Sequence, residues 1–202
     1  MGRPKAAEQT AGTRLKLDGR AAARMAAGFA AGLAFWLAFS GPYEKTVAAT
    51  AAFLIRTFES PAVTSLSAPD GEIRVDRSDL PPASPRPGLP AADLHFNFVL
   101  LAALFAFVPH PLEPRRFLRF WLSAAGLWGI HVLALVFQVE SIYAMRMGAW
   151  SEAHYGSFAR NFWTAGFHFY QIAGRFAAPF ALWWMAVKPD LGSRTSNFGR
   201  RI

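Results

Sequence analysis

One stretch decides the fold, and it is residues 117–139, FLRFWLSAAGLWGIHVLALVFQV. A helix rises 1.5 Å per residue, so about 20 apolar residues cross the roughly 30 Å hydrocarbon core of a bilayer. The stretch has this length, and its ionisable side chains are Arg119 and His131. It therefore predicts a membrane-spanning helix.

Three more apolar segments accompany it. They cover residues 21–39, 94–108 and 162–187. The first ends at Gly41-Pro42 and the last at Lys188-Pro189, whereas the second reaches spanning length only if residues 90–93 begin it. The chain of 202 residues is 53% hydrophobic and 17% charged, which is too apolar for an ordinary soluble domain. We expect an all-α integral membrane bundle of about four transmembrane helices, in contact with the lipid bilayer.

The distribution of lysine and arginine predicts the orientation. Bases are dense in residues 1–20, 109–116 and 188–202 and sparse in the longer loops, residues 40–93 and 140–161. Both termini are therefore expected in the cytoplasm and both long loops outside. Because this placement accounts for the net charge of +8, no nucleic-acid partner is expected. The alternative is that the first apolar segment is a signal peptide that is cleaved.

The first outer loop is expected to be structured. Residues 43–59 favour a helix, but their uncharged part, residues 46–55, is too short to span, which indicates an amphipathic helix lying on the membrane. The turn Ala68-Pro69-Asp70-Gly71 separates two strand-like runs and predicts a small β-hairpin over residues 63–77. The proline-rich residues 81–88 are expected to form an extended connector.

Polar residues in and beside the predicted spans are the candidate site. The candidate polar groove or partner-binding residues are His95, Asn97, His131, Gln138, Glu140, Asn161, Thr164, His168, Gln171 and Arg175. Those of the last segment recur at offsets of 0, 3, 7, 10 and 14, which places them on one face of a regular helix. We expect them to converge with the others near the outer surface, where His131 and His168 lie at similar depth.

Two interpretations of these polar residues remain open. Polar groups between membrane helices often form hydrogen bonds worth only about 0.6 kcal/mol each. Arg175 differs, because an arginine at the centre of a span costs at least about 2.5–3.5 kcal/mol. We therefore expect Arg175 to have a specific partner, with Glu140, Gln138 or backbone carbonyl groups as the candidates.

Residue inventory excludes several kinds of chemistry. The chain has no cysteine, so disulfides, thiolate ligands and a cysteine nucleophile are excluded. The histidines available for a zinc site are His95, His131, His154 and His168. No two of them have the i, i+4 spacing of a helical metal motif, and neither a metal nor a cofactor is expected. Gly28 and Gly32 form a G-x-x-x-G spacing that favours close helix contact and leaves room for an oligomer.

Several short runs resemble a known family. They are Ser40-Gly41-Pro42-Tyr43, Arg56-Thr57-Phe58-Glu59-Ser60-Pro61-Ala62-Val63, Leu94-His95-Phe96-Asn97-Phe98, His131-Val132-Leu133-Ala134-Leu135-Val136, Tyr155-Gly156 and Arg160-Asn161-Phe162-Trp163. With the predicted spans, amphipathic helix and hairpin, they resemble exosortases, the bacterial membrane transpeptidases that process C-terminal sorting signals on the outer side. They are more similar to small membrane proteins described as exosortase H-associated, over roughly residues 32–184. The resemblance implies a multipass protein of the bacterial inner membrane.

Departures from the exosortase pattern bear on activity. The resemblance implies a cysteine nucleophile at the start of the span after the hairpin, but this chain has Asp93-Leu94-His95-Phe96-Asn97 there. The expected function is that of a non-catalytic accessory protein of an exosortase-type sorting system, binding the sorting enzyme or its tailed substrate. Two alternatives stay open: a membrane enzyme that uses histidine acid-base chemistry at the periplasmic face, and a small transporter or proton path.

Overall fold

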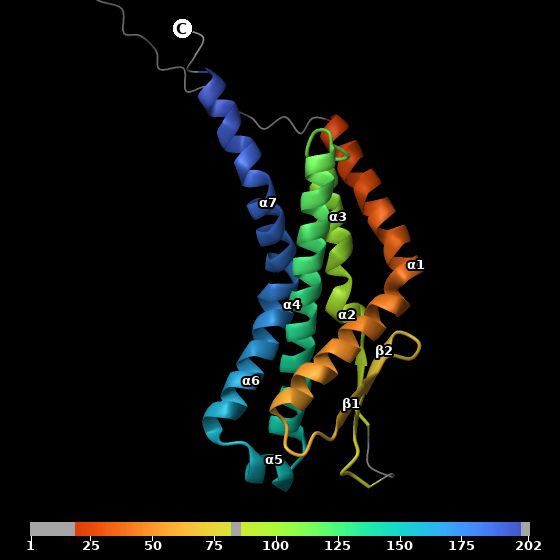
Figure 1. The fold of residues 1–202 in the computed structure, drawn as a ribbon, viewed down its shortest axis with the longest axis vertical. Coiled ribbons are helices and arrows are strands. Elements are labelled where there is room, and N and C mark those ends of the chain that lie inside the picture. Colours follow the sequence, from red (N-terminus) through yellow and green to blue (C-terminus); the bar gives the residue numbers. More distant parts are fainter. Residues whose placement is uncertain (1–18, 82–85, 199–202) are drawn as a thin grey trace, which may run out of the picture.

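The structure is a computed structural model that describes residues 19–81 and 86–198. Its elements are α1 (Gly19–Phe58), β1 (Thr64–Ser67), β2 (Glu72–Arg77), β3 (Gly88–Pro90), α2 (Ala92–His95), α3 (Asn97–Phe107), α4 (Pro114–Arg146), α5 (Ala149–His154), α6 (Ser157–Phe169), the π-helix η1 (Tyr170–Gly174) and α7 (Arg175–Phe198). In one half of the molecule the start of α1 packs against α3, and α7 packs against α3 and α4 on the side away from α1 (Figure 1). The end of α1, the sheet, α5 and the start of α6 form the other half, which we call the sheet half.

Helix α1 continues through Gly41-Pro42, where we expected the first span to end and a separate helix over residues 43–59 to begin. Proline lacks an N–H group and its ring crowds the carbonyl group four residues earlier, so it bends a helix if packing favours continuation. Figure 1 shows α1 changing direction partway along. Beyond the proline, Val47, Ala48 and Ala51 are buried in the core, which keeps the chain helical.

Helix α4 extends beyond the predicted span, residues 117–139, at both ends. Its last turns were expected in a loop, but Ile142, Tyr143 and Ala144 are buried there. Most of the remainder of that predicted loop is also helical, in α5 and the start of α6. The second apolar segment begins with α2 at Ala92, within the range that the sequence left open.

The last apolar segment is not the single regular helix expected over residues 162–187. Helical backbone runs from Ser157 to Phe198 and is interrupted by the π-helix η1. It also continues past Lys188-Pro189, where we expected it to end. A π-helix holds more residues per turn than an α-helix, so side chains before and after η1 are rotated relative to a regular helix.

The hairpin predicted over residues 63–77 is confirmed. Strands β1 and β2 pair antiparallel, with Leu66 opposite Val75. Asp70 and Gly71 in the turn have φ angles of 51° and 77°, a region that glycine and aspartate enter most readily. Residues 82–85 of the connector predicted over residues 81–88 lie outside the described residues. The prediction was wrong at its end, because Gly88 begins β3, which pairs with β2 and places Leu89 opposite Ile73.

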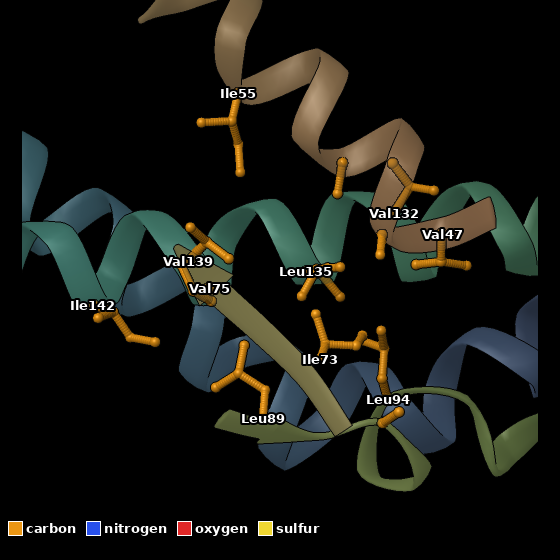
Figure 2. Packing of buried hydrophobic residues seen from close by; sticks show 14 of the residues in the cluster. Val47, Ile55, Ile73, Val75, Leu89, Leu94, Val132, Leu135, Val139 and Ile142 are labelled. Carbon is orange, nitrogen blue, oxygen red and sulfur yellow. The ribbon is translucent and has the colours of Figure 1, made fainter. Parts of the chain in front are cut away.

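The sheet packs its apolar face against two helices. Ile73, Val75 and Leu89 point from the sheet toward α4, and the second half of α1 covers the same cluster (Figure 2). On α4, Leu135 and Val139 are fully buried in this contact. Alternation along β2 explains the arrangement, since side chains two residues apart share one face of a strand. The sheet is thus fixed to the bundle by a continuous hydrophobic core.

The predicted close contact at Gly28 and Gly32 is confirmed, and it lies within the chain. A Cβ atom at Gly28 would stand 2.2 Å from Ala106 Cβ, and one at Gly32 would stand 2.7 Å from Ala102 Cβ. Both distances are far below van der Waals contact. The glycines therefore let α1 approach α3.

Two of the described helices, α1 and α4, are long and apolar enough to cross a membrane. The apolar stretch Ala92–Phe107 is shorter than this criterion requires. Length and composition therefore support membrane association through these two helices, and a mostly helical fold with a small sheet.

Candidate functional site

Seven polar side chains lie together as a group made of two hydrogen-bonded sets, which meet where the ring centroids of Tyr43 and His95 are 5.4 Å apart. We call this group the histidine network; it consists of Trp36, Tyr43, Glu44, His95, Asn97, His131 and Tyr170. His95 is 1% exposed and His131 is 0% exposed. Buried polar atoms are costly without hydrogen bonds, so the partners of the two imidazoles determine what the network can do.

The proton of His95 can be placed from its partners. Trp36 donates its indole N–H to His95 Nδ1 over 2.8 Å, and an indole nitrogen can only donate. His95 Nδ1 therefore carries no proton. The proton of the neutral ring is on Nε2, which donates to Glu44 Oε1 over 3.1 Å. Glu44 is 4% exposed, so the two groups form a buried carboxyl–imidazole pair.

The proton of His131 is fixed by Asn97. The amide Nδ2 of Asn97 donates to the carbonyl oxygen of Arg175 over 2.9 Å, which orients the amide group. Asn97 Oδ1 then accepts a hydrogen bond from His131 Nε2 over 2.8 Å. His131 Nδ1 is left as an acceptor, and the Tyr43 hydroxyl donates to it over 2.6 Å.

Each imidazole thus has both ring nitrogens bonded to groups of this chain. A general base needs a lone pair within hydrogen-bond reach of the substrate, and Trp36 and Tyr43 occupy the two lone pairs. The Tyr170 hydroxyl donates to the carbonyl oxygen of Leu94 and attaches η1 to α2. In this arrangement the network joins the helices around the bend of α1.

A second polar group lies in the sheet half. We call Glu59, Arg77, Asp79, Tyr143 and Trp150 the arginine cluster. Arg77 donates to Glu59 Oε1 over 2.9 Å and to both carboxylate oxygens of Asp79 over 3.0 and 2.9 Å. Its guanidinium carbon lies 4.7 Å from the ring centroid of Tyr143 and 4.5 Å from that of Trp150. These partners compensate for burying a side chain that is 6% exposed.

The side chains of Arg77 and Asp79 remain ionised at neutral pH. The hydrogen bond from Arg77 lowers the pKa of the Asp79 carboxyl. Burial of Arg77 works against its charge, but the hydrogen bond and the charge of Asp79 outweigh it and raise the pKa of the guanidinium. Burial, together with the hydrogen bond to Glu140, raises the pKa of Tyr155. Tyr155 therefore stays protonated and donates to Glu140 Oε2 over 2.7 Å.

The arginine cluster borders a cavity of about 740 Å³ between the end of α1, α4, α5 and α6. We call it the aromatic cleft. Its lining includes Phe58, Glu59, Arg77, Glu140, Tyr155 and Trp163. The Phe58 side chain is 88% exposed, so its ring is accessible to a ligand bound in the cleft.

The predicted site residues do not form one groove. His95, Asn97 and His131 meet in the histidine network, and Arg175 joins them through its backbone carbonyl group. Glu140 lies apart, in the aromatic cleft. The remaining predicted residues lie on the surface or are half-buried: Asn161 and His168 are exposed, and Gln138, Thr164 and Gln171 are half-buried.

The expected approach of His131 and His168 is absent. His131 bonds to Tyr43 and Asn97, whereas His168 is exposed with its ring centroid 5.1 Å from that of Phe167. The cause is η1. The offsets of 0, 3, 7, 10 and 14 share a face only if the helix is regular throughout, and the π-helix rotates Arg175 relative to the residues before it.

Arg175 has a different partner from those expected. Its Nη2 lies 3.6 Å from Asp93 Oδ1, at the start of α2, and its guanidinium carbon lies 5.7 Å from the Phe176 ring centroid. The side chains of Arg175 and Asp93 are 30% and 62% exposed. Pairing with Glu140 or Gln138 is therefore not what the structure shows.

Several residues of the two polar groups were not predicted, although the sequence holds signals for them. Glu44 lies three, four and seven residues before Val47, Ala48 and Ala51, on the apolar face of the helix. Arg77 follows Ile73 and Val75 at steps of two, on the buried face of β2. A charged residue at a buried register position indicates a specific partner. Neither signal identifies the partner itself.

Comparison with known proteins adds no relatives. A scan against protein-family models, a search of curated proteins and a search of solved structures each find no match to this chain.

Proposed function

We propose that this chain is a non-catalytic accessory protein of an exosortase-type C-terminal sorting system, and that it binds the sorting enzyme or its tailed substrate. The observation that carries the proposal is the histidine network. His95 and His131 have both ring nitrogens bonded within the chain, and the chain has no cysteine. These are the properties of a scaffold. The resemblance of the short runs to exosortase-associated proteins supports the identity of the partner.

In this proposal the protein crosses the bacterial inner membrane four times, through the first half of α1, α2 with α3, α4, and α6 with α7. The start of α1, the start of α4 and the end of α7 lie at the same end of the molecule (Figure 1). Arg20, Arg24, Arg115, Arg116 and Lys188 are near these ends, which favours a cytoplasmic location for them. The sheet half is then outside. Helices α2 and α3 together rise only about 24 Å, so the sheet would lie at the depth of the lipid headgroups.

Cysteine labelling tests this topology, because the chain is naturally free of cysteine. Ser65 and Ser157 are exposed in the sheet half, and Ser123 is 6% exposed within α4. We expect Ser65→Cys and Ser157→Cys to react with a membrane-impermeant maleimide in intact spheroplasts, and Ser123→Cys to react poorly. Reaction of Ser65→Cys only after the membrane is opened would reverse the proposed orientation.

Co-purification tests the function. The tagged protein, extracted from native membranes in a mild detergent, is expected to bring with it a cysteine-containing enzyme of the exosortase type. A strain lacking this chain is expected to accumulate unprocessed substrate, because the enzyme loses its partner. Mass spectrometry of the eluate and immunoblots of the substrate measure the two effects, with an unrelated four-span bait as the control.

A complementation arm separates the accessory role from histidine chemistry. His168 is exposed, so His168→Ala should leave the fold intact and restore processing in the deletion strain. Recovery of the protein alone, together with normal processing in the deletion strain, would refute the proposed role. Loss of processing with folded His168→Ala protein would instead favour an enzyme.

A further inference from the structure

The aromatic cleft has unequal charge. Its lining brings together the carboxylates of Glu59, Asp79 and Glu140, against the single guanidinium of Arg77. Charged side chains of one sign in a partly enclosed site raise the local concentration of the opposite charge. The cleft therefore favours a cation.

One carboxylate in the cleft has capacity left for a ligand. Glu59 accepts from Arg77, from the hydroxyl and backbone N–H of Thr64 and from the backbone N–H of Val63. Asp79 uses both oxygens on Arg77. Among the described residues, the hydrogen-bond donor to the Glu140 side chain is Tyr155, and it engages Oε2. Glu140 Oε1 is the acceptor that remains.

Aromatic rings line the same cavity as Glu140. Phe58 is 88% exposed and Phe162 is 49% exposed, and Trp163 lines the same cavity. Exposed rings of this size lower their free energy by packing against apolar groups, and their faces also attract cations. A volume of about 740 Å³ admits several side chains but not a folded domain.

We propose that the aromatic cleft holds an extended segment of a partner protein, in which a lysine or arginine side chain is flanked by apolar residues. The cation donates to Glu140, and the flanking side chains pack on Phe58 and Trp163. The excess of carboxylates repels the phosphate of a phospholipid headgroup, which favours a peptide over a lipid amine. This inference rests on the proposed binding of a protein at the sheet half and names the chemistry of the bound segment.

Peptide binding to the full chain in phosphatidylcholine nanodiscs tests the inference. One fluorescent peptide alternates lysine with leucine, and its matched partner carries glutamate in place of lysine. We expect the basic peptide to raise the fluorescence anisotropy, and the acidic one to leave it unchanged. Glu140→Gln keeps an acceptor for Tyr155 but removes the charge, and it is expected to weaken binding about tenfold. Phe58→Ala is expected to weaken it by a similar factor.

Matched controls keep the result specific. Glu152 is exposed on α5 and Phe53 is 63% exposed on α1, and neither lines the cleft. Glu152→Gln and Phe53→Ala should therefore bind as the unchanged protein does, and equal melting temperatures should show that all variants are folded. Equal binding of the two peptides, unchanged binding by Glu140→Gln, or loss of peptide binding when phosphatidylethanolamine is added would each overturn the inference.

The outcome is distinguishable from failure of the proposed function. If the basic peptide binds but no sorting enzyme co-purifies, the cleft is a peptide site in another system. If Glu140→Gln abolishes peptide binding yet the enzyme still co-purifies, the enzyme contacts another surface and the cleft holds the substrate. If the enzyme co-purifies and no peptide binds, the cleft inference alone is refuted.

Discussion

Replacing Arg77 with methionine is expected to destabilise the sheet half by about 3–5 kcal/mol, the cost of removing one partner from a buried ion pair. Glu59 and Asp79 would lose their shared guanidinium, and the Glu59 side chain is only 14% exposed. Glu59 joins Arg77 to the chain before β1, because it also accepts hydrogen bonds from the backbone N–H groups of Val63 and Thr64. Limited proteolysis of the protein in nanodiscs, with cleavage sites mapped by mass spectrometry, should show faster cutting between residues 59 and 80.

Arg74→Met is the matched control for this experiment. Arg74 lies on the same strand with its side chain on the opposite face, 55% exposed, and pairs with Glu72 at the surface. Exposed pairs contribute about 0–1 kcal/mol, so cleavage should remain near that of the unchanged protein. Combining Arg77→Met with Glu59→Gln and Asp79→Asn should recover part of the loss, because no unpaired charge remains. Equal sensitivity of Arg74→Met and Arg77→Met would show that the arginine cluster contributes no more than a surface pair.

Predictions from the sequence were correct where local chemistry determines structure. Residues 117–139 form the central part of α4, because an uninterrupted apolar segment of this length rarely adopts any structure other than a long helix. The turn at Asp70-Gly71 forms the hairpin, because few residue pairs adopt positive φ angles as easily. Gly28 and Gly32 mark a close helix contact, because small residues allow two backbones to approach.

Predictions failed where contacts between distant parts of the chain determine the local structure. By local rules Pro42 predicts the end of a helix. The apolar residues that follow it pack against the sheet and α4, and this burial keeps the chain helical beyond the proline. Strand β3 forms because β2 has a free edge, although Gly88 and Pro90 disfavour a strand locally. The π-helix η1 leaves no recognisable pattern in the sequence, and it rotates Arg175 away from the helix face that carries the predicted polar residues of α6.

The candidate site shows the same division. His95, Asn97 and His131 could be selected because polar residues in apolar segments are rare. Their partners Trp36, Tyr43 and Glu44 could not, since they come from α1, and the packing of α1 against α3 and α4 brings them to the histidines. Pairing across elements depends on tertiary geometry, which spacing along one segment does not contain.

The second large effect is expected at the contact between α1 and α3. Gly28→Ala should destabilise the protein by about 1–3 kcal/mol, the range for overpacking a filled interface. A Cβ atom at this position would lie 2.2 Å from Ala106 Cβ and 3.0 Å from the carbonyl oxygen of Ala102. Neither neighbour is a flexible side chain, so the two helices must separate. Thermal unfolding of the protein in nanodiscs, followed by circular dichroism, measures the change.

The sign of this effect separates packing from helix propensity. Alanine is favoured over glycine within helices by about 1 kcal/mol, so Gly129→Ala on α4, where a Cβ would have no neighbour within 4 Å, should be neutral or stabilising. The same substitution at Gly28 should destabilise the protein, because the clash with Ala106 outweighs the gain in helix propensity. Adding Ala106→Gly to Gly28→Ala removes the Cβ atom that the new alanine would meet on α3. The double variant should therefore recover most of the lost stability. If Gly28→Ala were instead as stable as Gly129→Ala, α1 would not rest on α3. The approach of Tyr43 and Glu44 to the histidines would then need another support.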